Sequence, residues 1–176
     1  LFEQSDMLLL QLELPLDTIR HACQMAREHD VSILINPSPW SESFNTVDFP
    51  CDILVMNEHE AACFTGERPF RITRELLHDH HLETVIVTQG VGPTLWLTAS
   101  QDVQELKPPA VTPVDTVGAG DAFTGALAVA LVEGQSLAGA VRFANAAGAL
   151  CVTREGAQGA VASREEIEEL ISSQSS

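Results

Sequence analysis

The sequence of 176 residues is long enough for one domain with a hydrophobic core, and no run in it approaches the roughly 20 apolar residues that a membrane-spanning helix needs. Nine basic and twenty-five acidic residues give a formal net charge of −16, which argues against a nucleic-acid-binding surface. Because Lys107 is the only lysine, a bound phosphate group would be held mainly by backbone N–H groups and a metal ion.

The first part of the chain predicts a strand, a helix and a second strand joined by short connections. Met7–Glu13 is apolar enough for a buried strand, and apolar residues then recur at helical spacing from Leu16 to His29. Val31–Asn36 is the next predicted strand. This order is typical of a right-handed βαβ unit in a parallel sheet.

The same alternation continues through the middle of the chain. Strands are predicted at Ile53–Met56 and Thr84–Thr88, with helices at Glu58–Thr65 and Ile72–His78 between them. Short β-prone pieces between Thr94 and Val114 predict antiparallel strands at a sheet edge, ending in a strand near Val114.

The last third predicts helices only. Asp121–Glu133 and a segment from Ser136 to about Val152 are both apolar nearly all round, so we expect two buried helices. Ser163, with a glutamate three residues later, forms a capping box that starts a final exposed helix before a polar tail at 172–176. No linker is evident, so we predict one domain over residues 1–171.

The strongest chemical signal is the segment Asp-Thr-Val-Gly-Ala-Gly-Asp at 115–121, just before a predicted buried helix. Glycines let the backbone approach a ligand, and the N–H groups at a helix start form an anion site. Asp121 could then accept a proton from an attacking hydroxyl. The alternative is a glycine-rich turn with a favourable acidic residue at a helix start. Phe123 stands where a dinucleotide fingerprint needs its third glycine, and the chain has no GxxxxGK[ST] P-loop.

Other polar clusters have structural explanations as well as functional ones. Asn57 and Glu60 lie on one helical face and could serve a metal ion, but they could equally form a capping box. The run 78–81 contains three histidines, and we interpret it as a solvated turn rather than a metal site. The four cysteines form no CxxC pair, which is typical of free thiols in a reducing, cytoplasmic compartment.

The sequence resembles the ribokinase family, also called the PfkB carbohydrate kinases, whose second signature is DTxGAGD followed by an apolar helix. The resemblance covers almost the whole chain and extends to blocks at 11–15, 36–39, 57–60, 142–147 and 153–158. It implies a ribokinase-like three-layer α/β/α sandwich, present only in part, because the N-terminal strands, the diglycine sugar motif and the lid of full-length members are absent. We therefore expect the C-terminal part of such a kinase.

The resemblance also implies a role for individual residues. Asp121 would be the catalytic base and would contact the sugar together with Glu13, while Gly118, Ala119 and Gly120 would form the anion hole. The residues implied at the nucleotide are Asn57, Thr88, Gln89, Gly90, Val91, Gly92, Gly120 and Asn145. Magnesium would involve Asn57 and Glu60, and the implied monovalent-cation residues are Asp115, Val117, Val152, Glu155 and Ala157.

The implied activity is the ATP-dependent transfer of the γ-phosphoryl group to a sugar hydroxyl, with ribose converted to ribose 5-phosphate as the first hypothesis. ATP, Mg²⁺ and K⁺ would be required, and the full-length protein could be a homodimer. Related kinases that act on deoxyribose, fructose or a nucleoside share the signature. A second hypothesis is a catalytically silent nucleotide-binding or assembly fragment.

Overall fold

The computed structural model describes residues 2–174, and these form two compact units. The first unit comprises residues 2–90 and 95–105, and the second comprises residues 91–94 and 106–174. The prediction of a single domain over 1–171 stays a prediction.

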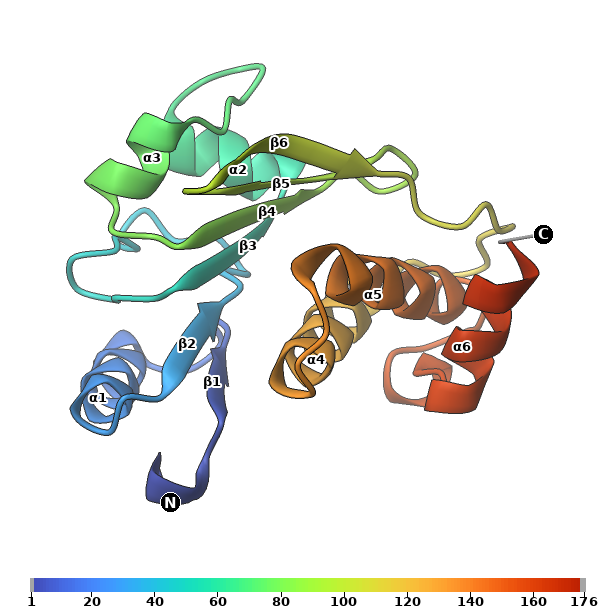
Figure 1. Cartoon of the computed structure of the whole chain (residues 1–176), viewed down its shortest axis with the longest axis horizontal. Coiled ribbons are helices and arrows are strands. Elements are labelled where there is room, and N and C mark those ends of the chain that lie inside the picture. Colours follow the sequence, from blue (N-terminus) through green and yellow to red (C-terminus); the bar gives the residue numbers. More distant parts are fainter. Residues whose placement is uncertain (1, 175–176) are drawn as a thin grey trace. The chain divides into compact units, whose positions relative to one another are not determined.

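A mixed six-stranded sheet, shown in Figure 1, organises the first unit, and its strands follow chain order across the sheet. The first four strands are parallel, whereas β4 and β5 are antiparallel. β6 follows β5 after two residues, a connection that suits antiparallel neighbours. The strands are β1 (Met7–Leu10), β2 (Ser32–Ile35), β3 (Ile53–Asn57), β4 (Thr84–Thr88), β5 (Thr94–Thr98) and β6 (Gln101–Leu106).

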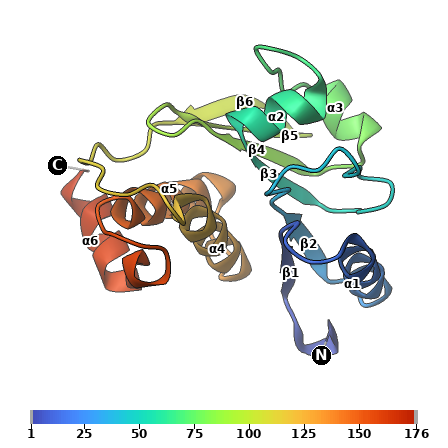
Figure 2. The same ribbon diagram turned by 180° about the vertical axis from the view of Figure 1, so that it is seen from behind.

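Three α-helices accompany this sheet: α1 (Leu16–Glu28), α2 (Glu58–Thr65) and α3 (Arg74–Asp79). A short 3-10 helix, η1 (Phe2–Gln4), precedes β1. Ile19, Cys23 and Ala26 are buried at helical spacing, so one face of α1 joins the core that also contains Ile33 and Leu54. Figure 2 shows α1 beside β1 and β2, and α2 beside β3 and β4. The α/β class predicted from the alternation of elements is confirmed.

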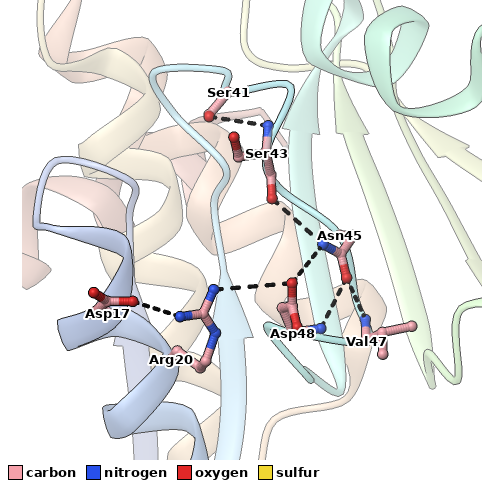
Figure 3. A network of polar contacts seen from close by, with 7 residues as sticks. All are labelled: Asp17, Arg20, Ser41, Ser43, Asn45, Val47 and Asp48. Carbon is pink, nitrogen blue, oxygen red and sulfur yellow. Dashed lines mark hydrogen bonds and ion pairs between the residues drawn. The ribbon is translucent and has the colours of Figure 1, made fainter.

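The long loop between β2 and β3 is fixed to α1 by polar contacts, shown in Figure 3. The Arg20 guanidinium lies 2.6 Å from Asp17 on its own helix and 3.9 Å from Asp48 in the loop. The Asn45 side chain accepts hydrogen bonds from the backbone N–H groups of Val47 and Asp48, which closes a local turn. These contacts give the loop a defined conformation against α1.

The second unit is helical, with α4 (Ala119–Val132), α5 (Leu137–Cys151), η2 (Gln158–Ala160) and α6 (Arg164–Ser173). Figure 1 shows α4 beside α5, and α6 beside α5. Small residues allow this packing: a Cβ atom on Gly148 of α5 would lie 3.3 Å from the carbonyl oxygen of Ala119, the first residue of α4. Among residues 2–174, no helix combines the length and apolar character needed to cross a membrane.

Several predicted boundaries are wrong, including the start of α4 at Ala119 rather than Asp121. β1 ends at Leu10 rather than Glu13, because the Leu12 N–H donates to the Ser38 carbonyl in the long loop. Helix α3 begins two residues later than predicted, because the Thr73 side chain caps its first turn. No strand leads to Val114, since residues 107–118 form neither helix nor strand. Prolines in that stretch cannot donate to a sheet, and the Val114 N–H donates to Val152 instead.

Candidate functional site

Polar residues follow four neighbouring strands of the first unit, where each strand ends. Glu13 comes three residues after β1, Asn36 follows β2, Asn57 ends β3 and Thr88 ends β4. Since these strands are parallel, their carboxyl ends share one edge of the sheet, where open α/β sheets place ligands. Glu13 is exposed there, as predicted from its position, and its role toward a sugar stays a prediction.

The predicted pair Asn57 and Glu60 forms a capping box at the start of α2, which confirms the capping interpretation. The Glu60 N–H donates to Asn57 Oδ1, and the Asn57 N–H donates to Glu60 Oε2, each at 2.9 Å. Glu60 is only 3% exposed, so its carboxylate faces the protein interior rather than solvent. A magnesium ion could contact the exposed Asn57 side chain more readily than Glu60, and the metal role of both residues stays a prediction.

Asn36 belongs to this arrangement although the sequence reasoning assigned it no role. Its side-chain Nδ2 donates to the Val55 carbonyl at 2.9 Å and to Glu60 Oε2 at 3.4 Å. The side chain is buried, so it fixes the Glu60 carboxylate from the neighbouring strand end. The sequence contained one signal for this role: Asn36 directly follows an apolar strand and precedes a proline. An amide buried at such a strand end needs hydrogen-bond partners.

The predicted nucleotide loop at 88–92 begins at the same sheet edge. Thr88 Oγ1 donates to the Met56 carbonyl, and Gln89 Nε2 donates to Glu58 Oε1, both at 3.4 Å. Gly90 adopts a φ of 57°, which favours glycine, and Val91 is 95% exposed. The structure thus presents an exposed turn after β4, and contacts of Gly92 and its neighbours with a nucleotide remain a prediction.

In the second unit, the glycine-rich segment leads into α4, which begins two residues before the predicted Asp121. Gly118 is the N-cap with a φ of 78°, and Ala119 is the first helical residue. A Cβ atom on Gly118 would lie 3.3 Å from Ala157 Cα, whereas one on Gly120 would meet nothing within 4 Å. The first N–H groups of a helix lack partners within it, and the absence of a side chain at Gly120 leaves room for an anion near this helix start.

Asp121 lies in the first turn of α4 and is exposed. It lines a cavity of about 350 Å³ whose other walls come largely from apolar side chains of α4, α5 and α6, including Phe143 and Ile167. A carboxylate one residue beyond Gly120 is thus beside the helix N-terminus. This geometry suits a proton acceptor next to a bound phosphoryl group.

The Asp115 carboxylate ties the glycine-rich segment to the loop after α5. Its Oδ1 accepts the Val117 N–H and its Oδ2 accepts the Gly156 N–H, each at 3.0 Å. These hydrogen bonds, that of Val117 first, hold the pKa of Asp115 below its ordinary value. The Val152 carbonyl accepts the N–H groups of both Val114 and Asp115.

The residues assigned to a monovalent cation are thereby brought together from two segments, 115–118 and 152–157. One carboxylate and several backbone carbonyls are the hard oxygen donors that alkali cations prefer. No group of three or more His, Cys, Asp or Glu suited to a metal occurs in the described part of the chain. K⁺ binding by Asp115, Val117, Val152, Glu155 and Ala157 stays a prediction.

Asn145, predicted at the nucleotide, is a buried residue of α5 with both ends of its amide engaged. Its Oδ1 accepts the Thr94 hydroxyl at 2.7 Å, and its Nδ2 donates to the Leu106 carbonyl at 3.3 Å. Asn145 also borders a cavity of about 230 Å³ together with Lys107 and Arg142. The amide therefore has a structural role within the second unit and lies next to two cations.

The interpretation of residues 78–81 as a solvated turn is wrong for one of them. His78 is exposed and pairs with Asp79, but His80 is half-buried. The His80 Nδ1 lies 3.0 Å from Thr46 Oγ1, and its ring centroid is 4.5 Å from that of Phe64. Burial lowers the pKa of His80, because desolvation disfavours the charged imidazolium.

Comparison with known proteins gives one consistent result. The pattern of the pfkB family carbohydrate kinases matches residues 1–164. A ribokinase from Bacillus subtilis strain 168 is 38% identical over 171 residues, which cover 97% of this chain and 56% of the relative. A deoxyribokinase from Salmonella typhi is 34% identical over 178 residues, covering 97% of this chain and 57% of the relative.

A solved structure confirms the predicted fold. The structure of an Arabidopsis thaliana ribokinase complexed with ribose and ATP superposes with a TM-score of 0.83 at 28% identity. The match covers 97% of this chain and 57% of the other. The chain thus spans a little over half the length of the curated relatives it matches.

Proposed function

This chain belongs to the pfkB family of carbohydrate kinases, and we propose that it is the C-terminal part of an ATP-dependent kinase that phosphorylates a sugar hydroxyl. One observation of the structure carries the proposal. Gly118 caps α4 in a left-handed conformation and Asp121 lies in its first turn, so a carboxylate lies three residues from the N-cap, and a Cβ on Gly120 between them would meet nothing within 4 Å. Helix N–H groups and a carboxylate are the two groups that phosphoryl transfer to an alcohol needs from a protein.

In the proposed reaction, the N–H groups at the start of α4 stabilise the negative charge that develops on the transferring phosphoryl group. The Asp121 carboxylate accepts the proton of the sugar hydroxyl as its oxygen attacks phosphorus, and ADP leaves. A magnesium ion, when bound, would neutralise charge on the phosphate oxygens. Lys107 and Arg142 beside Asn145 add positive charge that would favour an anionic nucleotide.

Ribose is the substrate that we propose first, because the ribokinases of Bacillus subtilis and Arabidopsis thaliana match almost the whole chain. A deoxyribokinase matches nearly as well, so deoxyribose is the second candidate. Glu13 is the sugar contact that we assign in this chain. The residues that would distinguish the two pentoses must then lie mostly in the remainder of a full-length protein.

The test is ADP formation by a full-length protein that contains this chain, with ribose, deoxyribose and fructose as substrates in parallel. We expect turnover that depends on sugar, with kcat/KM highest for ribose. Absence of ADP formation with every sugar would contradict the kinase proposal. A preference for deoxyribose or fructose would contradict only the choice of ribose.

A further inference from the structure

The arginine and lysine side chains of this acidic chain divide into two groups. Five of the nine form ion pairs with Asp or Glu, as Arg74 does with Asp102 at 2.9 Å. Within residues 2–174 the other four, which are Arg68, Arg71, Lys107 and Arg142, form none. Each of these four lines a cavity, which links the unpaired positive charge to concave surface. Lys107 and Arg142 line the cavity beside Asn145, where we propose that the nucleotide binds.

Arg68 and Arg71 line a separate cavity within the first unit, with a volume of about 550 Å³. This volume is within the range of roughly 300–1,000 Å³ that small-molecule sites occupy. The cavity lies between the α2 helix, the segment 68–73 that follows it, and residues of β5 and β6. None of the residues assigned above to sugar or magnesium lines it, and only Gln89 of the nucleotide loop does.

The walls of this cavity are mostly apolar. They include Ala62 from α2, Phe70 from the following segment, Leu95 from β5 and Val103 from β6. Val103 is 45% exposed and is flanked in β6 by Asp102 and Gln104, so an apolar side chain at the cavity is left uncovered. A ligand with an apolar body would bury this surface.

The charge at the cavity favours an anion. Two exposed arginines line it in a chain with a formal net charge of −16, and neither forms an ion pair with a carboxylate within residues 2–174. One carboxylate, that of Glu58, also lines the cavity, but its Oε1 accepts a hydrogen bond from Gln89 Nε2. Guanidinium groups bind carboxylate, sulfonate and phosphate groups through directed pairs of N–H donors.

We propose that this cavity is a binding site for a small organic anion that has an apolar body and one terminal anionic group. The apolar body would lie against Leu95 and Val103, and the anionic group would be held by Arg68 and Arg71. The site does not rest on the proposed kinase reaction, because Gln89 is the one residue of its wall that is also assigned to the nucleotide.

Two fluorescent probes of nearly equal shape test the proposal on the purified chain. Anilinonaphthalene sulfonate carries one negative charge, and phenyl-naphthylamine is its uncharged counterpart. We expect the double variant Arg68→Ala/Arg71→Ala to lose about tenfold in affinity for the sulfonate and to bind the neutral probe unchanged. Arg74→Ala is the matched control, because Arg74 is close in sequence but paired with Asp102 and absent from the cavity wall.

A second variant tests the apolar wall without touching charge. Ala62→Phe narrows the cavity from the α2 side, so we expect it to weaken both probes to a similar degree. Far-ultraviolet circular dichroism of each variant checks that the fold is kept. The proposal is overturned if the wild-type chain shows no saturable binding of the sulfonate. It is also overturned if Arg74→Ala weakens sulfonate binding as much as the double variant does, or if the double variant weakens both probes equally.

Discussion

Replacing Gly118 with alanine should destabilise the chain by roughly 2–3 kcal/mol, for two separable reasons. Gly118 has a φ of 78°, and an alanine in the left-handed region costs about 1–2 kcal/mol. Its new Cβ would also lie 3.3 Å from Ala157 Cα and 3.4 Å from Ala157 Cβ, so the loop after α5 must shift. We assign about 1 kcal/mol to this steric contact, the low end for overpacking.

Two control variants separate these contributions. Gly66→Ala carries a similar strain, with a φ of 69°, but its Cβ would meet nothing within 4 Å, so only about 1–2 kcal/mol should be lost. Gly120 has no positive φ, and the Cβ atom of Gly120→Ala would meet nothing within 4 Å, so the helix should be unchanged or slightly more stable. Combining Gly118→Ala with Ala157→Gly removes one of the two close contacts and should recover part of the steric cost.

Urea unfolding followed by circular dichroism measures these differences from the transition midpoint. In thermal unfolding, a loss of about 2 kcal/mol corresponds to roughly 4–8 °C for a chain of this size. If Gly118→Ala cost no more than Gly66→Ala, the contact with Ala157 would be irrelevant to stability. The close approach of Ala157 to Gly118 would then have no influence on the start of α4.

Three further predictions concern neighbouring residues. In a full-length protein, Asp121→Asn should lower kcat by about 10²- to 10⁴-fold and leave the nucleotide Kd nearly unchanged, and an unaltered kcat would remove Asp121 as the base. The pKa of Asp115 is lowered in the folded chain, so its carboxylate contributes stability above the ordinary aspartate pKa of about 3.9. That stability is lost as the pH falls through the pKa of the folded state. The stability gap between wild type and Asp115→Asn should therefore shrink on acidification, and a gap independent of pH would contradict this. Asn57→Ala should cost about 0.5–2 kcal/mol in urea unfolding, with Glu60→Gln costing less because the glutamine oxygen still accepts the capping hydrogen bond.

Features determined by neighbouring residues could be predicted from the sequence. The strand and helix order followed from hydrophobic periodicity, and the capping boxes at Asn57 and Ser163 lie where their i, i+3 spacing indicated. The glycine pattern placed the start of α4 to within two residues, at Asp121 rather than Ala119. These features depend on residues within one helical turn, so the sequence contains them directly.

Features that join distant segments could not be predicted in this way. The Asp115 carboxylate meets the Gly156 N–H across 41 residues, and Asn36 meets Glu60 across 24. The burial of His80 beneath the long loop depends on Thr46, which is 34 residues away. Each contact requires two segments to be placed by the fold, and neither segment signals its partner by composition.

The two glycines at the start of α4 show that the proposed anion site depends both on the local sequence motif and on contacts with a distant segment. Gly120 has open space where its Cβ would be, so its lack of a side chain leaves room for a ligand rather than for protein. Gly118 is required by the protein itself, because of its φ and its contact with Ala157. The glycine motif therefore combines one position that shapes the helix start with another that leaves room for the proposed phosphate. Since Asp115 holds the same two segments together through Gly156, the helix start is positioned by the loop after α5, and its geometry depends on that loop as much as on the motif.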